Sequence, residues 1–376
     1  MHDHLSLRRW PFFVVPEPSR CDFIADREHF RDDVEKLLRT LSRQNASSIH
    51  PIWSWFGAGK THTLHYISNK AAQLHEHGAS HLATVYSEFP RNPRSFVDVY
   101  KSFALQLDRE LLSDAYLEIT TAQDAERLER DLLQTSSDLA CALKVLVIGN
   151  AADKELAMRW VRAEPLPVAD CRKLGISRRI ISSEDSTRAL IGIVRVFGLS
   201  AASQNQVNSR LIWQLDELQR IDELPPRVRH EINTGLHSTF NACPTGLTMI
   251  LSFSGHPSES LPEWFSPELK DRIGRTKVMI LPPMNRNDAM KFVRDVLQHS
   301  RPEDGPGPEP YFPFTEETCG IIIDDITDHG DLKPRAIMQA FDAVLREADM
   351  DIETGRIKVI APSFARKILS ELVKLE

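Results

Sequence analysis

The chain has 376 residues, and its 46 Lys and Arg against 53 Asp and Glu give a formal net charge of −7. With 41% hydrophobic and 26% charged residues, the composition is that of an ordinary globular protein. It excludes a disordered chain, a collagen-like fibre and a protein coated in basic surface. The longest apolar runs, such as 189–194, stop well short of the ~20 residues that a membrane-spanning helix needs. Five widely spaced cysteines indicate free thiols in a cytoplasmic protein.

The first predicted elements are typical of an α/β sheet with parallel strands. Apolar residues recur at helical spacing from Asp26 to Leu41, and Asp26 can cap the start of this helix. The apolar run 49–55 predicts a strand that ends in a glycine-containing loop, and a helix is expected from about Thr61. The run 82–86 predicts the next strand. Strand, loop, helix and strand in this order begin a parallel α/β sheet.

Residues 95–200 show no convincing strands and predict a helical insertion. A helical pattern starts at Phe96, and either Ser182 or Ser183 is expected to cap a later helix. The run 145–148 is ambiguous, because a short apolar run fits a strand as well as a helix.

Strands return in the second half of the chain, and a helical region ends it. The predicted strands are 211–215, 247–253 and 277–281, and the predicted helices are 226–241, 285–299, 315–326, 333–348 and 362–374. A linker rich in proline and glycine covers 301–313. We therefore predict an α/β domain at 1–300, with its insertion at 95–200, and a small helical domain at 301–376.

The sharpest local signal lies between a predicted strand and a predicted helix, in the sequence Ser-Trp-Phe-Gly-Ala-Gly-Lys-Thr from Ser54 to Thr61. Backbone N–H groups of a glycine-rich turn and of a helix N-terminus can surround the charged oxygens of a triphosphate. Lys60 is expected to reach the β- and γ-phosphates, and the Thr61 hydroxyl to ligate Mg²⁺. The usual first glycine of this motif is Ser54 here. The candidate residues for binding ATP are Gly57, Ala58, Gly59, Lys60, Thr61 and His62.

An acidic pair follows the predicted strand 211–215 and is the expected partner of residues 54–61, called here the phosphate loop. Asp216 is expected to hold Mg²⁺ through water, and Glu217 to polarise the attacking water as a general base. The alternative is that the two acids only cap the following turn. A pair of acids at a strand end, in place of a single Asp, favours ATP hydrolysis over simple nucleotide storage.

These motifs in this order resemble the AAA+ ATPases, and the resemblance covers about Asp22 to the C-terminus. It implies a P-loop parallel sheet with a helical insertion and a C-terminal helical lid. It also implies that Ser254 or Ser252 senses the γ-phosphate or the attacking water, although a purely structural serine remains an alternative. Arg272, or as second choice Arg275, resembles the arginine finger that completes a neighbouring subunit's site; the alternative is a solvated surface arginine.

Two further segments carry the resemblance. Residues 330–335 look like the motif that opens the lid helix, which implies that Arg335 closes on the γ-phosphate. The glycine stands two residues further from the Pro-Arg pair than in the family pattern, and pairing of Arg335 with a nearby acid is the alternative. Residues 25–28 resemble the N-terminal box of initiator-type members, which packs near adenine. Residues 10–12 are candidates either for walls of that base pocket or for plain core packing.

The resemblance to initiator, transposition-regulator and phage-defence ATPases implies an ATP-driven switch. Such a protein would hydrolyse ATP with Mg²⁺, assemble with itself as a ring or helix, and load, gate or activate a partner such as a nuclease or transposase. DNA is a candidate partner, a membrane is not, and antiviral defence is a candidate context. One alternative is a signalling-type nucleotide switch with little turnover and no DNA contact. Another is an adaptor whose nucleotide is purely structural.

Overall fold

The computed structural model describes residues 3–76, 81–203, 209–258, 260–274, 278–302 and 309–372. The chain forms two compact units. The unit called here the loop–lid unit consists of Met1–Asp33, Ser54–Asn69 and Ile280–Glu376, and the sheet unit consists of Val34–Trp53 and Lys70–Met279. Helices α1 (Glu28–Leu41) and α2 (Lys60–Glu76) contribute residues to both units. The domain division at residue 300 stays a prediction.

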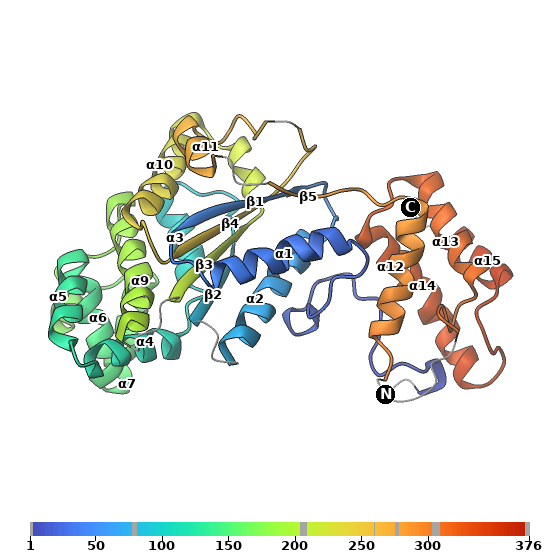
Figure 1. Cartoon of the computed structure of the whole chain (residues 1–376), viewed down its shortest axis with the longest axis horizontal. Helices are drawn as coiled ribbons and strands as arrows, with labels where there is room; N and C mark the ends of the chain where they lie inside the picture. The colour runs from blue at the N-terminus through green and yellow to red at the C-terminus, as the bar shows by residue number, and fades with distance from the viewer. Residues whose placement is uncertain are drawn as a thin grey trace. The chain divides into compact units, whose positions relative to one another are not determined.

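The sheet has five strands in the order β2-β3-β4-β1-β5, so the predicted α/β fold is confirmed (Figure 1). The strands are β1 (Ser48–Ser54), β2 (His81–Glu88), β3 (Ser209–Asp216), β4 (Leu247–Ser254) and β5 (Met279–Leu281). β3 pairs in parallel with both β2 and β4, and Glu88 lies opposite Asp216 at the end of its strand. Because β2 and β3 run in parallel, their carboxyl ends meet at one edge of the sheet.

The two faces of the central strands differ in polarity, because successive side chains of a strand point to opposite faces. On one face, Trp213, Met249 and Phe253 are buried in a large apolar core. Helices α3 (Phe96–Ala104), α9 (Ser183–Ser203) and α10 (Pro226–Ala242) contribute to this core. The alternate positions of β3 and β4 include polar residues, and these are also buried: Arg210, Gln214, Asp216, Thr248 and Ser252.

The predicted insertion is helical from α3 to α9. Between these two helices lie α4 (Arg109–Thr121), α5 (Ala125–Thr135), α6 (Ser137–Ile148), α7 (Ala151–Val161) and α8 (Val168–Lys173), and Figure 1 shows α4 to α7 grouped beside α9. The ambiguous run 145–148 is the last turn of α6. Ser136 caps α6, and Leu139, Leu143 and Leu146 are buried at helical spacing. Of the two candidate caps for α9, the Ser182 hydroxyl accepts the hydrogen bond from the Asp185 N–H, at 3.1 Å.

The loop–lid unit packs four C-terminal helices around a second apolar core. They are α12 (Arg286–His299), α13 (Glu316–His329), α14 (Pro334–Glu353) and α15 (Pro362–Leu372). The N-terminal segment, which comprises residues 3–27, also contributes to this core. The Phe12 ring lies 5.4 Å from that of Phe341, and Phe12 is 1% exposed. Trp10 donates a hydrogen bond to Asp342 at 2.7 Å. Phe12 and Trp10 thus pack against the lid helices.

Two further short helices lie in the sheet unit. The 3₁₀-helix η3 (Leu218–Glu223) follows the acidic pair, and α11 (Pro267–Ile273) begins where the Ser266 hydroxyl accepts from the Leu269 N–H. The sequence interpretation had not assigned a helix to either segment. Within the residues described, none of the helices is both long enough and apolar enough to span a membrane.

A reciprocal capping box starts α12 and permits a test of local stability. The Asn285 side chain accepts from the Asp288 N–H at 3.0 Å, and the Asp288 carboxylate accepts from the Asn285 N–H at 3.2 Å. We expect Asn285→Ala to lower the free energy of unfolding by about 1 kcal/mol. Denaturant unfolding measures the change, and Gln298→Ala, at an exposed position of the same helix, is the control. Equal stability of the two variants would contradict a contribution from the cap.

Candidate functional site

The phosphate loop lies in the loop–lid unit and connects β1 to α2. Gly57 has φ +76° and Gly59 has φ +97°, values in the left-handed region that side chains other than glycine rarely adopt. A Cβ atom on Gly57 would also come within 3.4 Å of the Arg335 Cβ. The turn therefore requires glycine at both positions, which explains the Gly-Ala-Gly sequence.

Lys60 is buried on its own loop, with 5% of its surface exposed. Its Nζ donates to the Ser54 hydroxyl and to the Trp55 carbonyl, both at 3.2 Å. Ser54 ends β1 and has no positive φ. A serine is therefore tolerated where the usual motif has glycine, and its hydroxyl additionally holds the lysine.

His62, in the first turn of α2, contacts the N-terminal segment. Its Nε2 is 2.7 Å from the Phe23 carbonyl oxygen, and its ring stacks with that of Phe13 at 6.4 Å. Burial lowers the pKa of His62 below its usual value. Thr61, one residue earlier, is half-buried in the first turn of α2. The roles of His62 in nucleotide binding and of Thr61 in Mg²⁺ binding stay predictions.

Arg27 is a residue that the sequence interpretation missed as a partner of the phosphate loop. Its Nη1 donates to the Ala58 carbonyl at 2.7 Å, and its Nη2 donates to the Pro282 carbonyl at 3.1 Å. Burial lowers the pKa of Arg27 to about 10, against the opposing effect of nearby carboxylates. Arg27 lies in residues 25–28, whose resemblance to the N-terminal box drew attention to this segment. No pattern in the sequence indicated that Arg27 contacts the phosphate loop.

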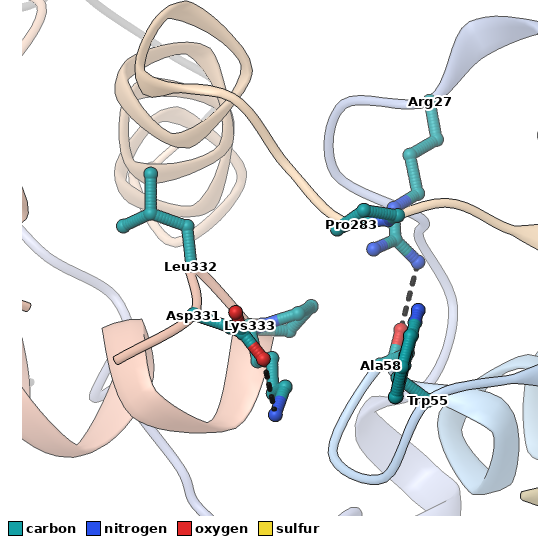
Figure 2. Close-up of a pocket in the computed structure, with 8 residues that line it drawn as sticks. Arg27, Trp55, Ala58, Pro283, Asp331, Leu332 and Lys333 are labelled. Carbon is teal, nitrogen blue, oxygen red and sulfur yellow. Dashed lines mark hydrogen bonds and ion pairs between the residues drawn. The ribbon is translucent and has the colours of Figure 1, made fainter. Parts of the chain in front are cut away.

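A pocket of about 160 Å³ opens beside the phosphate loop (Figure 2). Arg27, Trp55 and Ala58 line it together with residues that follow β5 or lead into the lid helix α14: Pro283, Asp331, Leu332, Lys333 and Pro334. All of these residues belong to the loop–lid unit. The phosphate loop, Arg27 and the residues that lead into α14 therefore line one pocket.

The start of the lid helix α14 contacts the phosphate loop through the backbone. The Arg335 N–H donates to the Gly57 carbonyl at 3.4 Å. The Arg335 guanidinium is exposed, and it forms no hydrogen bond or ion pair with any residue in the described part of the chain. The acids proposed as alternative partners pair elsewhere: Asp331 with Lys333, Asp324 with Arg286 and Asp325 with His329.

In the sheet unit, Asp216 ends β3 as a buried carboxylate that is 1% exposed. Its Oδ1 accepts from the Ser252 hydroxyl at 2.7 Å and from the Glu217 N–H at 2.8 Å. Its Oδ2 accepts from the Tyr86 hydroxyl at 3.4 Å. Burial first, and the charge of Asp216 second, raise the pKa of Tyr86 and keep it protonated. Asp216 is thus oriented by β2, β4 and its own backbone.

Glu217 has an unusual backbone and two side-chain partners. Its φ is +60°, in the left-handed region. Its Oε2 accepts from Gln219 Nε2 at 2.9 Å and forms an ion pair with Arg220 at 3.4 Å. Gln219 and Arg220 lie two and three residues after Glu217, yet the sequence interpretation gave neither of them a role, because η3 was not predicted.

The two serines considered as sensors have different surroundings. The Ser252 hydroxyl donates to Asp216. The Ser254 hydroxyl is buried and has no hydrogen-bond partner among the residues described, while the Ser254 N–H donates to Gln219 Oε1 at 2.8 Å. Ser252 is therefore engaged with Asp216, and Ser254 keeps an unused hydroxyl. The sensor role of Ser254 stays a prediction.

Arg272 lies on α11 with its side chain exposed. As far as the structure describes the chain, its guanidinium has no hydrogen bond or ion pair. Such a group suits either a neighbouring subunit or solvent, so both interpretations of Arg272 stay open. The second choice, Arg275, lies outside the described residues.

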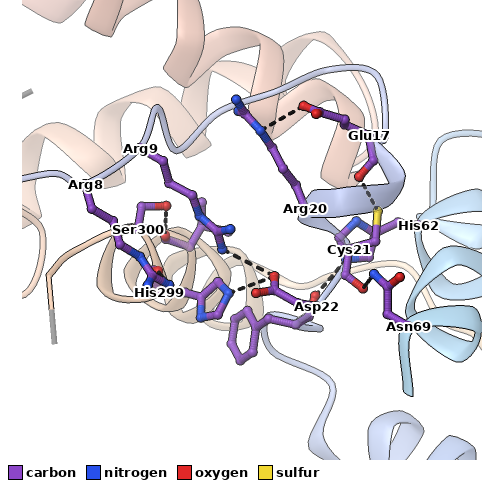
Figure 3. Close-up of polar contacts among 12 residues, drawn as sticks. Arg8, Arg9, Glu17, Arg20, Cys21, Asp22, His62, Asn69, His299 and Ser300 are labelled. Carbon is purple, nitrogen blue, oxygen red and sulfur yellow. Dashed lines mark hydrogen bonds and ion pairs between the residues drawn. The ribbon is translucent and has the colours of Figure 1, made fainter. Parts of the chain in front are cut away.

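The N-terminal segment contacts both α2 and α12 within the loop–lid unit (Figure 3). On α2, the Asn69 side chain donates to the Cys21 carbonyl at 3.0 Å. On α12, the Asp22 carboxylate accepts from His299 at 3.0 Å, and the Phe23 ring stacks on His299 at 4.5 Å. Arg9 donates to the same carboxylate at 3.3 Å. The segment thus links α2, the helix that follows the phosphate loop, to α12.

This link predicts a pH-dependent contribution to stability. Burial by itself would raise the pKa of Asp22, but the hydrogen bond and charge of His299, together with Arg9, lower it below its usual value. A lowered folded-state pKa stabilises the fold above the unfolded-state pKa, and this stabilisation disappears as the pH falls through the folded-state value. We expect Asp22→Asn to be less stable than the unaltered chain at pH 6, and the difference to shrink below about pH 4. Urea unfolding at both pH values tests this, with the exposed Asp32→Asn as control; a pH-independent difference would contradict the ion pair.

Comparison with known proteins finds similarity at the level of structure. No protein-family model and no curated protein sequence matches the chain. The ORC2 protein of Aeropyrum pernix, solved as ADPNP–ADP complexes, is similar with a TM-score of 0.55 and 13% identity, over 93% of this chain and 70% of that one. The ORC1 protein of Aeropyrum pernix in complex with DNA gives a TM-score of 0.53 and 12% identity, over 98% of this chain and 70% of that one. Drosophila ORC bound to DNA gives a TM-score of 0.50 and 11% identity, over 99% of this chain and 65% of that one.

These similarities extend over the parallel sheet, the insertion and the helical C-terminal region together, since they cover more than nine-tenths of the chain. They agree with the resemblance carried by the phosphate loop and the acidic strand end. The chain therefore shares the fold of these ORC proteins, as its resemblance to the initiator-type AAA+ ATPases led us to expect.

Proposed function

We propose that this chain is a switch that binds and hydrolyses ATP with Mg²⁺ and works as a homo-oligomer. The observation that carries the proposal is the phosphate loop itself, with two left-handed glycines and a buried lysine at the start of a helix. Such a loop presents backbone N–H groups and a positive charge to phosphate oxygens. The fold shared with nucleotide-bound ORC2 supports the same assignment.

The residues present fit a magnesium nucleotide. Asp216 offers a buried, oriented carboxylate and Thr61 a hydroxyl, and Mg²⁺ prefers such oxygen ligands. Bound Mg²⁺ would neutralise charge on the phosphate oxygens. Gly57, Ala58 and Gly59 would present their N–H groups to the phosphates, and Lys60 its charge.

The remaining roles in hydrolysis follow from each side chain's chemistry. Glu217 would take the proton of the attacking water, and Ser254 would hold that water or the γ-phosphate through its unused hydroxyl. Arg335 and a neighbouring subunit's copy of Arg272 would stabilise the charge that develops on the γ-phosphate. Both arginines are exposed and lack partners in the described part of the chain, which leaves them available for that role.

For the partners, we propose self-assembly, DNA as a candidate, and a protein effector such as a nuclease or transposase, in a defence or mobile-element context. The similarity to ORC proteins solved with DNA supports DNA as the first partner to test. The rival proposal is a signalling-type switch with little turnover and no DNA contact. An exposed Arg272 fits either one, because both kinds of protein can assemble through a bound nucleotide.

The direct test is an equilibrium titration of the full chain with a fluorescent ATP analogue, with and without Mg²⁺. We expect saturable binding that Mg²⁺ strengthens, together with ATP-dependent growth in size on a sizing column. Arg272→Ala should reduce both the assembly and the hydrolysis. The absence of nucleotide uptake in the presence of Mg²⁺ would refute the proposal. Stimulation of hydrolysis by DNA that weakens with rising salt would support a DNA partner, and no stimulation at low salt would favour the signalling rival.

A further inference from the structure

We infer that Gln219 is a positioning residue for ATP hydrolysis: it fixes the Glu217 carboxylate to the end of β4. The inference rests on the proposed function, because it assigns Gln219 a task only if Glu217 acts as the base. The evidence is one side-chain amide with two different contacts. Its Nε2 donates to Glu217 Oε2 at 2.9 Å, and its Oε1 accepts from the Ser254 N–H at 2.8 Å.

The backbone explains why Glu217 meets Gln219. Glu217 leaves the strand at φ +60° and ψ +29°, and η3 begins with the next residue. A left-handed conformation is uncommon for a residue other than glycine and persists where surrounding contacts fix it. The amide of Gln219 supplies such a contact two residues further on. The turn therefore brings the carboxylate of Glu217 close to the amide of Gln219 in the first turn of η3.

The other groups around Glu217 do not duplicate this contact. Arg220 forms its ion pair with Glu217 at 3.4 Å, but it also donates to the Phe89 carbonyl at 2.6 Å and lies 3.6 Å from Glu88. Its guanidinium is thus divided among several acceptors. Gln219 is neutral, so it orients the carboxylate and leaves its negative charge in place. Because a general base must lie within hydrogen-bond reach of the water that it deprotonates, the orientation of the Glu217 carboxylate affects the rate of ATP hydrolysis.

The second contact of Gln219 links the base to the sensor strand. The Ser254 N–H that donates to Gln219 belongs to the residue whose hydroxyl is buried and without a partner among the residues described. One amide therefore sets the distance between the proposed base and the proposed sensor hydroxyl. A residue that only stabilised η3 would not need both contacts.

Two substitutions separate the contacts. Gln219→Met keeps the length of the side chain and removes both hydrogen bonds. Gln219→Glu keeps an acceptor for the Ser254 N–H, but it places a carboxylate against Glu217. We expect each variant to lower kcat by at least about tenfold, with the KM for Mg-ATP and the binding of a fluorescent ATP analogue changed less than about twofold. Gln134→Glu, the same chemical change at an exposed position of α5, is the matched control and should behave like the unaltered chain.

A double-mutant cycle shows whether Gln219 acts through Glu217. In a Glu217→Gln background, Gln219→Met should change the single-turnover rate less than about twofold, because the group that it positions is already gone. Equal effects in both backgrounds, or a Gln219→Glu variant with unaltered kcat, would overturn the inference and leave Gln219 a support for the end of β4. If Gln219→Met does not fold, Gln219→Glu decides alone. A chain that hydrolyses no ATP before any substitution would contradict the proposed function itself, which is a different result.

Discussion

Glu217→Gln is expected to lower the rate of ATP hydrolysis by at least about a hundredfold, because it removes the only proposed general base. The amide keeps the size of the carboxylate and can still contact Gln219 and Arg220, so the turn at φ +60° should survive. Binding of Mg-ATP should remain within about threefold, since Glu217 is assigned to the attacking water and not to the phosphates. Single-turnover hydrolysis and equilibrium binding, measured on the same preparation, provide both numbers.

Glu223→Gln is the control for this prediction, because it makes the same change at an exposed position of η3. It should hydrolyse ATP at the rate of the unaltered chain. Two results would count against the proposed role of Glu217. Hydrolysis that persists in Glu217→Gln would assign the base elsewhere. Negligible hydrolysis in the unaltered chain, with nucleotide binding intact, would favour the signalling-type switch; bound nucleotide that is not released on dilution would favour the structural adaptor.

Lys60→Met is expected to weaken Mg-ATP binding by at least about tenfold. A charge-assisted hydrogen bond to a phosphate oxygen contributes roughly 1.5–3 kcal/mol, which corresponds to about ten- to a hundredfold in affinity. Met retains the apolar stem of Lys60, which is buried, and removes its charge. The Ser54 hydroxyl and the Trp55 carbonyl would then lose the donor that they share. Isothermal titration with a non-hydrolysable ATP analogue measures the change without interference from turnover.

Lys36→Met, at an exposed position of α1, is the matched control because it removes the same charge from the surface. Its affinity for the analogue should be that of the unaltered chain. An unchanged affinity in Lys60→Met would place the triphosphate away from the phosphate loop and would remove the main support for ATP binding.

The elements that the sequence predicted best are those in which local chemistry and burial agree. The strand ending at Ser54 and the helix after it were correct within two residues, because an apolar run, a glycine turn and a helix start follow one another directly. The run 145–148 could not be assigned in this way. Its apolar side chains fit a strand equally well, and the cap at Ser136 together with the packing of α6 made it helical. The start of α1 was also misplaced by two residues: Asp26 has φ +47°, so it lies outside the helix.

The sequence by itself determined the kinds of residues in the candidate site: a glycine turn with a lysine, a strand that ends in two acids, and arginines in the segments that follow. Only the tertiary structure decided which side chains these residues touch. In the structure, the Ser252 hydroxyl donates to Asp216, and Arg27 donates to the Ala58 carbonyl. His62 contacts the Phe23 carbonyl, and Gln219 forms hydrogen bonds with both Glu217 and Ser254. The physical reason is that periodicity and motif spacing report a residue's own backbone and burial. A hydrogen bond between residues such as Arg27 and Ala58 depends instead on how separate segments pack, and no local pattern records it.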